Sequence, residues 1–195
     1  MSNIIQGDDT MHLSADAMRK YIVKEYRQLI EKEVGVQEAK GNKKVPVALV
    51  MAIIAQESKG NPFAIRYEPS YFFWLTNRLT KAAFKDLPGT KLGICSKDTE
   101  MKLRACSFGL MQVLGQTARE NGFDGIYITE LCDVETSIRI GLNYLSKLCN
   151  KYEHETHAVA AYNAGSVKLG AGGTIMNQEY IDKVMAHKTQ FELLL

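Results

Sequence analysis

Residues 47–55, VALVMAIIA, form an almost uninterrupted apolar run that leads directly into Glu57 and Ser58. Pro46 suits the first turn of a helix, where a missing N–H costs nothing, and the Gly-Asn-Pro sequence at 60–62 supplies a left-handed cap and a stop. The pattern therefore predicts a helix between these two signals. A surface helix carries an apolar stripe, whereas this one is apolar on every face, which indicates a central, buried position.

Glu57 is the one acidic residue of this predicted helix, and it lies in the last turn. It shares a face with Ile53 and Ile54, four and three residues earlier. Partial burial and the negative end of the helix dipole both disfavour a carboxylate, so we expect a raised pKa, as a general acid needs. A glutamate at a helix end is more commonly solvated, so position alone does not assign it a function.

The remaining pattern predicts an all-α protein. No segment keeps the strict alternation of a half-buried strand, and no internal repeat or low-complexity tract is present. Residues 34–44, rich in Gly, Lys and Asn, are interpreted as a linker. Besides the apolar helix, the spacing of apolar residues and the caps predict helices over residues 15–32, 69–87, 96–105, 117–121, 134–152, 157–164 and from 177 onward.

Composition allows one domain with a substantial core and argues against several classes of protein. Hydrophobic residues make up 46% of the 195 residues, and the net charge of +2 is too small to indicate a nucleic-acid partner. No apolar stretch reaches the length of a membrane span. The four Cys and four His residues lack metal-ligand spacing, so we expect neither a metal site nor a cofactor.

Three short motifs follow one another along the chain. Glu57-Ser58 ends the apolar helix, GLMQ occupies residues 109–112, and AYNAG occupies residues 161–165. Together, and in this order, they resemble the catalytic domain of soluble lytic transglycosylases, whose fold is like that of lysozyme and especially goose-type lysozyme. The segment EYIDKV at 179–184 looks like the Tyr-containing helix that closes the family domain.

The resemblance covers about residues 44–187, with one departure. Glu57 and Gly109 are further apart than in compact members of the family, so residues 67–105 are interpreted as an inserted helical segment. The expected organisation is a leader and helix at 1–43 packed on a lysozyme-like catalytic domain at 44–195.

The resemblance implies cleavage of the β-1,4 bond between N-acetylmuramic acid and N-acetylglucosamine in peptidoglycan. In this family a single Glu protonates the leaving oxygen and then takes a proton from the C6 hydroxyl of muramic acid, which attacks C1. The product is a 1,6-anhydro sugar, and no water is consumed. The internal nucleophile has a proximity advantage over solvent.

The matching motif positions carry the expected site. Glu57 is the catalytic acid and base, Tyr162 is expected to orient it through its hydroxyl, and Gln112 supports the sugar subsites. Further residues are expected to contact the substrate or close the cleft, with packing or turn formation as the alternative for each: Ser107, Phe108, Met111, Asn163 and Tyr180.

Two other functions fit the same residues. A goose-type muramidase would hydrolyse the same bond and would need a second carboxylate to hold water, for which Asp86, Asp98 and Asp124 are candidates. A wall-binding module that kept only the scaffold is the other possibility, although the retained Glu57 argues against it.

The expected partner is the peptidoglycan glycan strand. The N-terminal residues show no basic segment followed by an apolar run, so we expect synthesis in the bacterial cytoplasm without a signal peptide and action on the wall in the periplasm. This combination favours a bacteriophage lysis enzyme or a virion-associated one, with a phage pore-forming protein or the virion as a partner.

Overall fold

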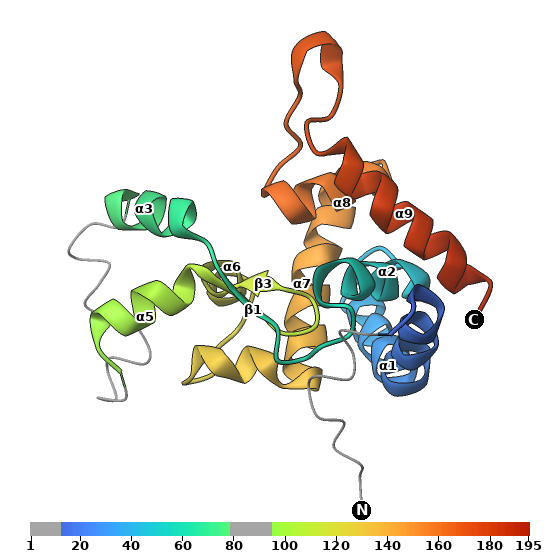
Figure 1. Ribbon diagram of the computed structural model, residues 1–195, viewed down its shortest axis with the longest axis horizontal. Helices are drawn as coiled ribbons and strands as arrows, with labels where there is room; N and C mark the ends of the chain where they lie inside the picture. The colour runs from blue at the N-terminus through green and yellow to red at the C-terminus, as the bar shows by residue number, and fades with distance from the viewer. Residues whose placement is uncertain (1–12, 79–94) are drawn as a thin grey trace, which may run out of the picture.

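The computed structural model describes residues 13–78 and 95–195, and helices dominate it. In Figure 1, α3 and α5 lie on one side of a small sheet and α1, α2, α8 and α9 on the other. The elements of the described residues run in this order: α1 (Ala15–Ala39), α2 (Val47–Ser58), β1 (Ile65–Tyr67), α3 (Pro69–Arg78), α5 (Lys97–Arg104), β2 (Cys106–Phe108), β3 (Val113–Leu114), α6 (Gly115–Glu120), η1 (Ile128–Cys132), α7 (Val134–Lys151), α8 (Glu155–Ala164), η2 (Ala171–Gly173) and α9 (Gln178–Glu192).

Helix α2 forms the centre of the core. Every side chain from Ala48 to Ala55 is buried, and α1 and α9 pack against it. The helix begins after Pro46 and ends at Ser58, as the sequence predicts. An element with no polar face is stable only when neighbours cover it on all sides, and this requirement gathers α1, α7, α8 and α9 into one core.

Helix α1 is longer than predicted, because it continues to Ala39 through the segment interpreted as a linker. Val34 and Gln37 are buried there, and the Gln37 Nε2 donates to Asn143 Oδ1 on α7 at 2.6 Å. Packing against α7 therefore outweighs the weak helix propensity of Gly35.

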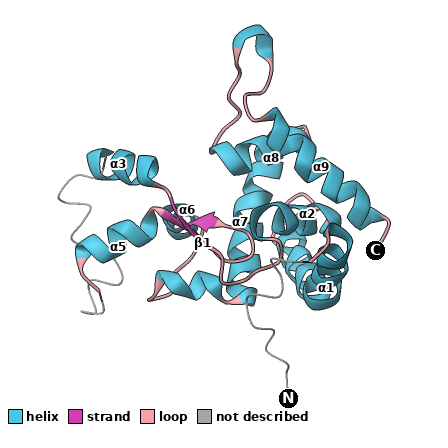
Figure 2. Cartoon of the chain, in the orientation of Figure 1, coloured by secondary structure: helices cyan, strands magenta, loops and turns pink. Residues whose placement is uncertain are grey.

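The all-α expectation omitted a sheet. Within the described residues three short antiparallel strands pair in the order β1-β2-β3, with Arg66 opposite Ser107 and Phe108 opposite Val113. Figure 2 shows this sheet as a small element among helices. The strands contain only two or three residues, too few for alternation to appear in the sequence.

The segment between β1 and β2, which contains α3 and α5, has a small apolar core of its own. Leu75 on α3 and Met101 on α5 are buried together, with Tyr71 and Phe72 packed against them. Residues 79–87 of the predicted helix, like Asp86, lie outside the described residues. In the described part of this segment, these apolar contacts pack α3 against α5 and not against the main core.

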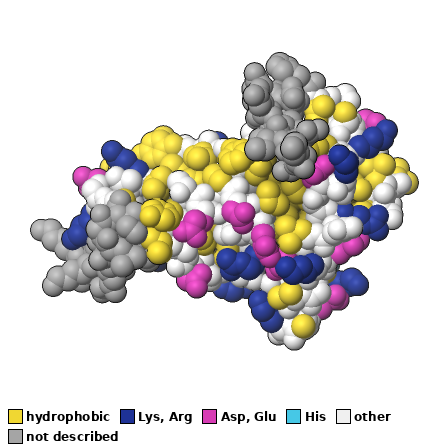
Figure 3. All heavy atoms as spheres, turned by 90° about the horizontal axis from the view of Figure 1, so that it is seen from below, with side chains coloured by type: hydrophobic (Ala, Val, Ile, Leu, Met, Phe, Trp, Pro, Cys, Tyr) yellow, Lys and Arg dark blue, Asp and Glu magenta, His cyan; other side chains and the backbone are white. Residues whose placement is uncertain are grey.

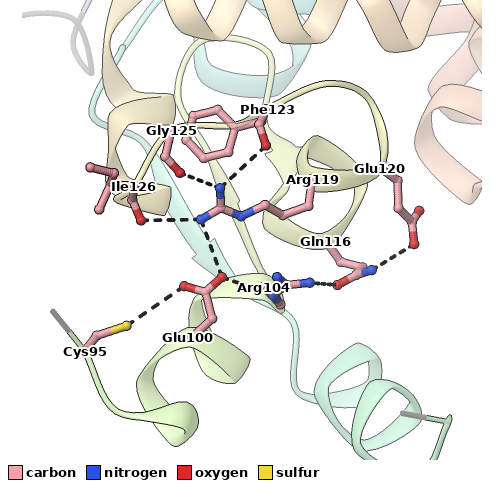
Figure 4. Close-up of polar contacts among 9 residues, drawn as sticks. All are labelled: Cys95, Glu100, Arg104, Gln116, Arg119, Glu120, Phe123, Gly125 and Ile126. Atoms are coloured by element: carbon pink, nitrogen blue, oxygen red, sulfur yellow. Dashed lines mark hydrogen bonds and ion pairs between the residues drawn. The ribbon is translucent and has the colours of Figure 1, made fainter. Parts of the chain in front are cut away.

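Helix α5 is attached to the rest of the protein by a buried charged cluster (Figure 4). Glu100 is 1% exposed and accepts hydrogen bonds from Arg104 Nε at 3.1 Å and Arg119 Nη2 at 3.5 Å. Arg119 also donates to the carbonyls of Phe123, Gly125 and Ile126. One carboxylate thus joins α5 to α6 and to the loop that follows α6.

The surface mixes charges of both signs. Figure 3 shows acidic and basic side chains interspersed on the face seen from below, in keeping with the net charge of +2. No helix of the described residues combines the length and the apolar character that crossing a membrane requires.

Replacing Glu100 by Ala should destabilise the protein by about 3–5 kcal/mol, because two arginines would lose their buried partner. Urea denaturation followed by circular dichroism measures this change. The control is Glu179→Ala, which removes an exposed ion pair with Lys183 and should cost less than about 1 kcal/mol. Equal effects of the two substitutions would contradict the structural role of the cluster.

Candidate active site

The end of α2 is fixed by hydrogen bonds from both sides. Ser58 Oγ donates to the Leu110 carbonyl at 2.7 Å and accepts the Gly60 N–H at 3.2 Å. The Tyr26 hydroxyl donates to the Gly60 carbonyl at 2.9 Å. The left-handed cap begins one residue earlier than predicted, with Lys59 at φ 54° followed by Gly60 at φ 82°.

This sharp stop leaves Glu57 half-buried, with its carboxyl at a cleft. The Tyr180 hydroxyl on α9 donates to Glu57 Oε1 at 2.5 Å. Burial raises the pKa of Glu57, while the Tyr180 hydrogen bond and the charge of Arg66 lower it and the charge of Glu68 raises it again. Burial has the largest effect, so the net direction is upward, as the sequence predicts.

The GLMQ segment is a tight turn that requires Gly at position 109. Gly109 has φ 72°, and a Cβ there would lie 2.1 Å from the Leu131 carbonyl oxygen. Gln112 also has a positive φ, 46°, and its Nε2 donates to the carbonyls of Ala64 at 2.8 Å and Gly109 at 2.9 Å. The side chain of Gln112 therefore holds the turn against the start of β1 while it lines the cleft.

The structure corrects the expected substrate contacts of Phe108 and Met111. Both side chains are completely buried in the main core, and neither lines the cleft. Met111 packs so closely on α7 that a Cβ at Gly141 would lie 2.3 Å from its sulfur. The neighbouring Ser107 does line the cleft.

The structure gives two tyrosines hydrogen-bond partners other than those expected. The hydroxyl of Tyr162, predicted to orient Glu57, donates instead to the Met111 carbonyl at 2.8 Å. Tyr180, predicted to close the far side, is the residue that donates to Glu57. Asn163 lines the cleft, and its Oδ1 accepts a hydrogen bond from Asn177 Nδ2 at 3.0 Å.

The cleft beside Glu57 has a volume of about 730 Å³, within the range of roughly 300–1,000 Å³ that ligand sites occupy. Its lining comes from α2, β1, α3, β2, β3, α6, α7 and α8 and from the loops after β1, β2 and α8. Besides the expected Glu57, Ser107, Gln112, Tyr162 and Asn163, the lining includes residues that sequence reasoning did not assign to the site: Arg66, Glu68, Ser70, Tyr71, Trp74, Val113, Leu114, Thr117, Tyr144, Ala164, Gly165 and Lys168.

Glu68 is the second carboxylate of this cleft. Its Oε1 accepts a hydrogen bond from Arg66 Nε at 2.5 Å, and its side chain is 35% exposed. Asp98 and Asp124, two of the acids considered from the sequence, are exposed and do not line the cleft. The sequence contained one indication of this pair. Glu68 follows Arg66 by two residues, and side chains two residues apart lie on the same face when the segment is extended like a strand.

The cleft thus holds one carboxyl group suited to donate a proton. Glu57 accepts a hydrogen bond from the neutral hydroxyl of Tyr180, and one positive side chain, Arg66, and one negative side chain, Glu68, lie near it. The described residues contain no group of three or more His, Cys, Asp or Glu side chains that could hold a metal ion.

A comparison with protein families places these observations in context. The family model described as Transglycosylase SLT domain matches residues 35–182, which include all three motifs. The match and the helical architecture confirm the all-α, lysozyme-like fold class inferred from those motifs. No curated protein matches the chain.

Replacing Tyr180 by Phe should raise the pKa of Glu57 further, because the hydroxyl stabilises the ionised carboxylate. The carboxyl ¹³C shift of Glu57, followed by NMR over a pH titration, measures the change.

Tyr162→Phe is the matched control, since its hydroxyl bonds the Met111 carbonyl and not Glu57. That variant should lose about 1–3 kcal/mol of stability and leave the pKa of Glu57 nearer its original value. A larger rise in Tyr162→Phe than in Tyr180→Phe would contradict the assignment.

Proposed function

This chain belongs to the transglycosylase SLT domain family, and on that premise we propose that it cleaves the muramic acid to glucosamine bond of peptidoglycan without water. The family makes it an enzyme of the lytic transglycosylase type that acts on peptidoglycan of the cell wall. The finer proposal concerns the route, namely formation of a 1,6-anhydromuramic acid product.

The protonation state of Glu57 carries this proposal. A lytic transglycosylase needs one carboxyl group that is protonated when the substrate binds and can act as a base afterwards. Burial raises the pKa of Glu57 in the direction that the first step requires. Tyr180 stabilises the ionised form that exists between the two steps.

In this proposal Glu57 alone carries out both proton transfers. Its carboxyl proton passes to the glycosidic oxygen as the bond between that oxygen and C1 of muramic acid breaks. The Glu57 carboxylate then accepts the proton of the C6 hydroxyl while the C6 oxygen forms a bond to C1. Glu57 is protonated again at the end, and no water has entered the product.

The other residues of the cleft serve to bind and orient the glycan in this proposal. Ser107 and Asn163 line the cleft and offer a hydroxyl and an amide for sugar contacts. Gln112 acts by holding the turn, because its amide N–H groups already donate to two backbone carbonyls. Tyr162 acts in the same way through the Met111 carbonyl, and Tyr180 acts on Glu57 directly.

Glu57→Gln should lower lytic activity by about 10²- to 10⁴-fold, since the amide cannot donate the proton. Mass spectrometry of muropeptides released by the unaltered protein should find products lighter by one water than hydrolytic ones, without new reducing ends. Glu31→Gln, an exposed acid on α1, is the control and should retain activity. Full activity of Glu57→Gln would refute the assignment, and glycan binding without lysis by the unaltered protein would favour a wall-binding module.

A hydrolytic muramidase is the second candidate, and Glu68 is the observation that favours it. Glu68 lines the same cleft as Glu57 and lies close enough to influence its pKa. A carboxylate in that position could hold an attacking water, as paired carboxylates do in hydrolytic glycosidases. Its ion pair with Arg66 suits an ionised group rather than a second acid.

Glu68→Gln separates the two routes. In a transglycosylase it should change the rate by less than about tenfold, because only a partly exposed ion pair is lost, and the anhydro products should persist. The measurement is again muropeptide mass spectrometry, with reducing-end assays beside it. Reducing ends from the unaltered protein that disappear in Glu68→Gln would establish hydrolysis with Glu68 as the water-holding group.

The proposal extends to the biological setting. A bacteriophage origin, as a lysis or virion-associated enzyme, remains the expectation from sequence, with a pore-forming protein or the virion as the partner. The support for it is that the family acts on peptidoglycan, the polymer that such an enzyme must degrade.

A further inference from the structure

Helix α3 turns two aromatic side chains toward the cleft. Tyr71 and Trp74 both line it, although α3 belongs to the segment between the Glu57 and GLMQ motifs and not to the main core. Trp74 is 45% exposed, whereas Leu75 beside it is buried against Met101. The packing of α3 on α5 is therefore satisfied by Leu75, and Trp74 remains available to solvent in the cleft.

The two rings pack against each other at the cleft. Their centroids lie 5.2 Å apart with an interplanar angle of 35°. The Arg78 guanidinium lies 4.9 Å from the centroid of the Trp74 ring, and Arg78 is not part of the cleft lining. The cation therefore packs on the indole from outside the cleft lining and helps to fix the orientation of the ring, while Trp74 stays 45% exposed.

An aromatic surface of this kind suits a sugar ring. A pyranose has a face rich in C–H groups and a rim of hydroxyl and amide groups, so its apolar face can stack on an indole while its polar rim stays hydrated. Together Tyr71 and Trp74 form an apolar patch among the polar residues of the cleft, an arrangement typical of ligand-binding grooves. The same cleft contains Glu57, so a glycan strand that reaches α3 is also a strand that passes the reacting carboxyl.

We propose that Trp74, supported by Tyr71, forms a subsite that stacks on one N-acetylhexosamine ring of the glycan strand, away from the bond that is cleaved. This inference rests on the proposed function for the identity of the glycan. It gives the segment between the two motifs a role in holding the polymer. Trp74 contributes binding and takes no part in the chemical step.

Phe73 provides a matched control on the same helix. It is 70% exposed, next to Trp74 in sequence, and does not line the cleft. A general effect of losing an aromatic residue from α3 would be the same at both positions. An effect specific to the subsite would occur only at Trp74.

The test uses the fluorescence of the protein itself, because Trp74 is the single tryptophan of the sequence. Oligomers of N-acetylglucosamine are titrated into Glu57→Gln protein, and binding is measured in parallel by calorimetry. The proposal expects a saturable change in tryptophan emission with the same Kd as the calorimetric titration. Saturated calorimetric binding with unchanged emission would overturn it.

Variants in the Glu57→Gln background complete the test. Trp74→Ala should bind the oligomers about three- to tenfold more weakly, and Trp74→Phe should restore part of the affinity. Phe73→Ala should bind normally. With Glu57 intact, Trp74→Ala should raise KM on isolated peptidoglycan and leave kcat nearly unchanged.

The outcomes separate this inference from the proposed function. Normal binding by Trp74→Ala, or equal losses in Trp74→Ala and Phe73→Ala, overturns the subsite while Glu57-dependent lysis stands. A protein that neither binds the oligomers nor degrades peptidoglycan overturns both. Circular dichroism melting identifies a variant that fails to fold, and Trp74→Phe then decides the question.

Discussion

The hydrogen bond from Ser58 to the Leu110 carbonyl joins the two halves of the site. The next carbonyl along the chain, that of Met111, accepts the hydroxyl of Tyr162. Two adjacent carbonyls of the GLMQ turn, those of Leu110 and Met111, thus accept hydrogen bonds from Ser58, which follows Glu57, and from Tyr162 of the AYNAG motif. Because buried carbonyls left without donors are costly, the three motifs hold one another in place. Most of their residues serve this framework, and Glu57 is the part of it that reaches the cleft.

The sequence predicted those parts of the structure that depend on neighbours along the chain. The bounds of α2 and the raised pKa of Glu57 followed from the apolar run, the Pro46 start and the glycine stop. The sheet and the partner of Glu57 could not be predicted in this way. The strands are stabilised by pairing across 40 or so residues and not by local pattern, and Tyr180 reaches Glu57 through the packing of α9 on α2, a contact between residues 123 positions apart. The bond of Tyr162 to the Met111 carbonyl, rather than to Glu57, likewise depends on packing between distant segments.

The segment between the Glu57 and GLMQ motifs is stabilised differently from the main core. Its apolar core is small, with Leu75 and Met101 at its centre. Its attachment combines the packing of Leu103 on the main core with the Glu100 carboxylate between Arg104 and Arg119. A buried ion cluster is directional, so it fixes the orientation of α5 more strictly than an apolar contact of equal size would. That orientation matters because α5 leads directly into β2, which carries Ser107, and supports α3, which carries Trp74. A charged cluster far from Glu57 in sequence thereby helps to set the shape of the cleft.

The surroundings of Glu57 balance opposing effects. Burial favours the protonated carboxyl, whereas the Tyr180 hydroxyl and Arg66 favour the carboxylate, and Glu68 offsets part of the effect of Arg66. A group that only donated a proton would work best with burial alone, and a group that only accepted one would work best with strong donors. A single residue that must do both in turn requires a pKa between these extremes. The half-buried helix end with one neutral hydroxyl donor suits the two roles proposed for Glu57, so the position of Tyr180 on α9 matters as much as the apolar helix that carries Glu57.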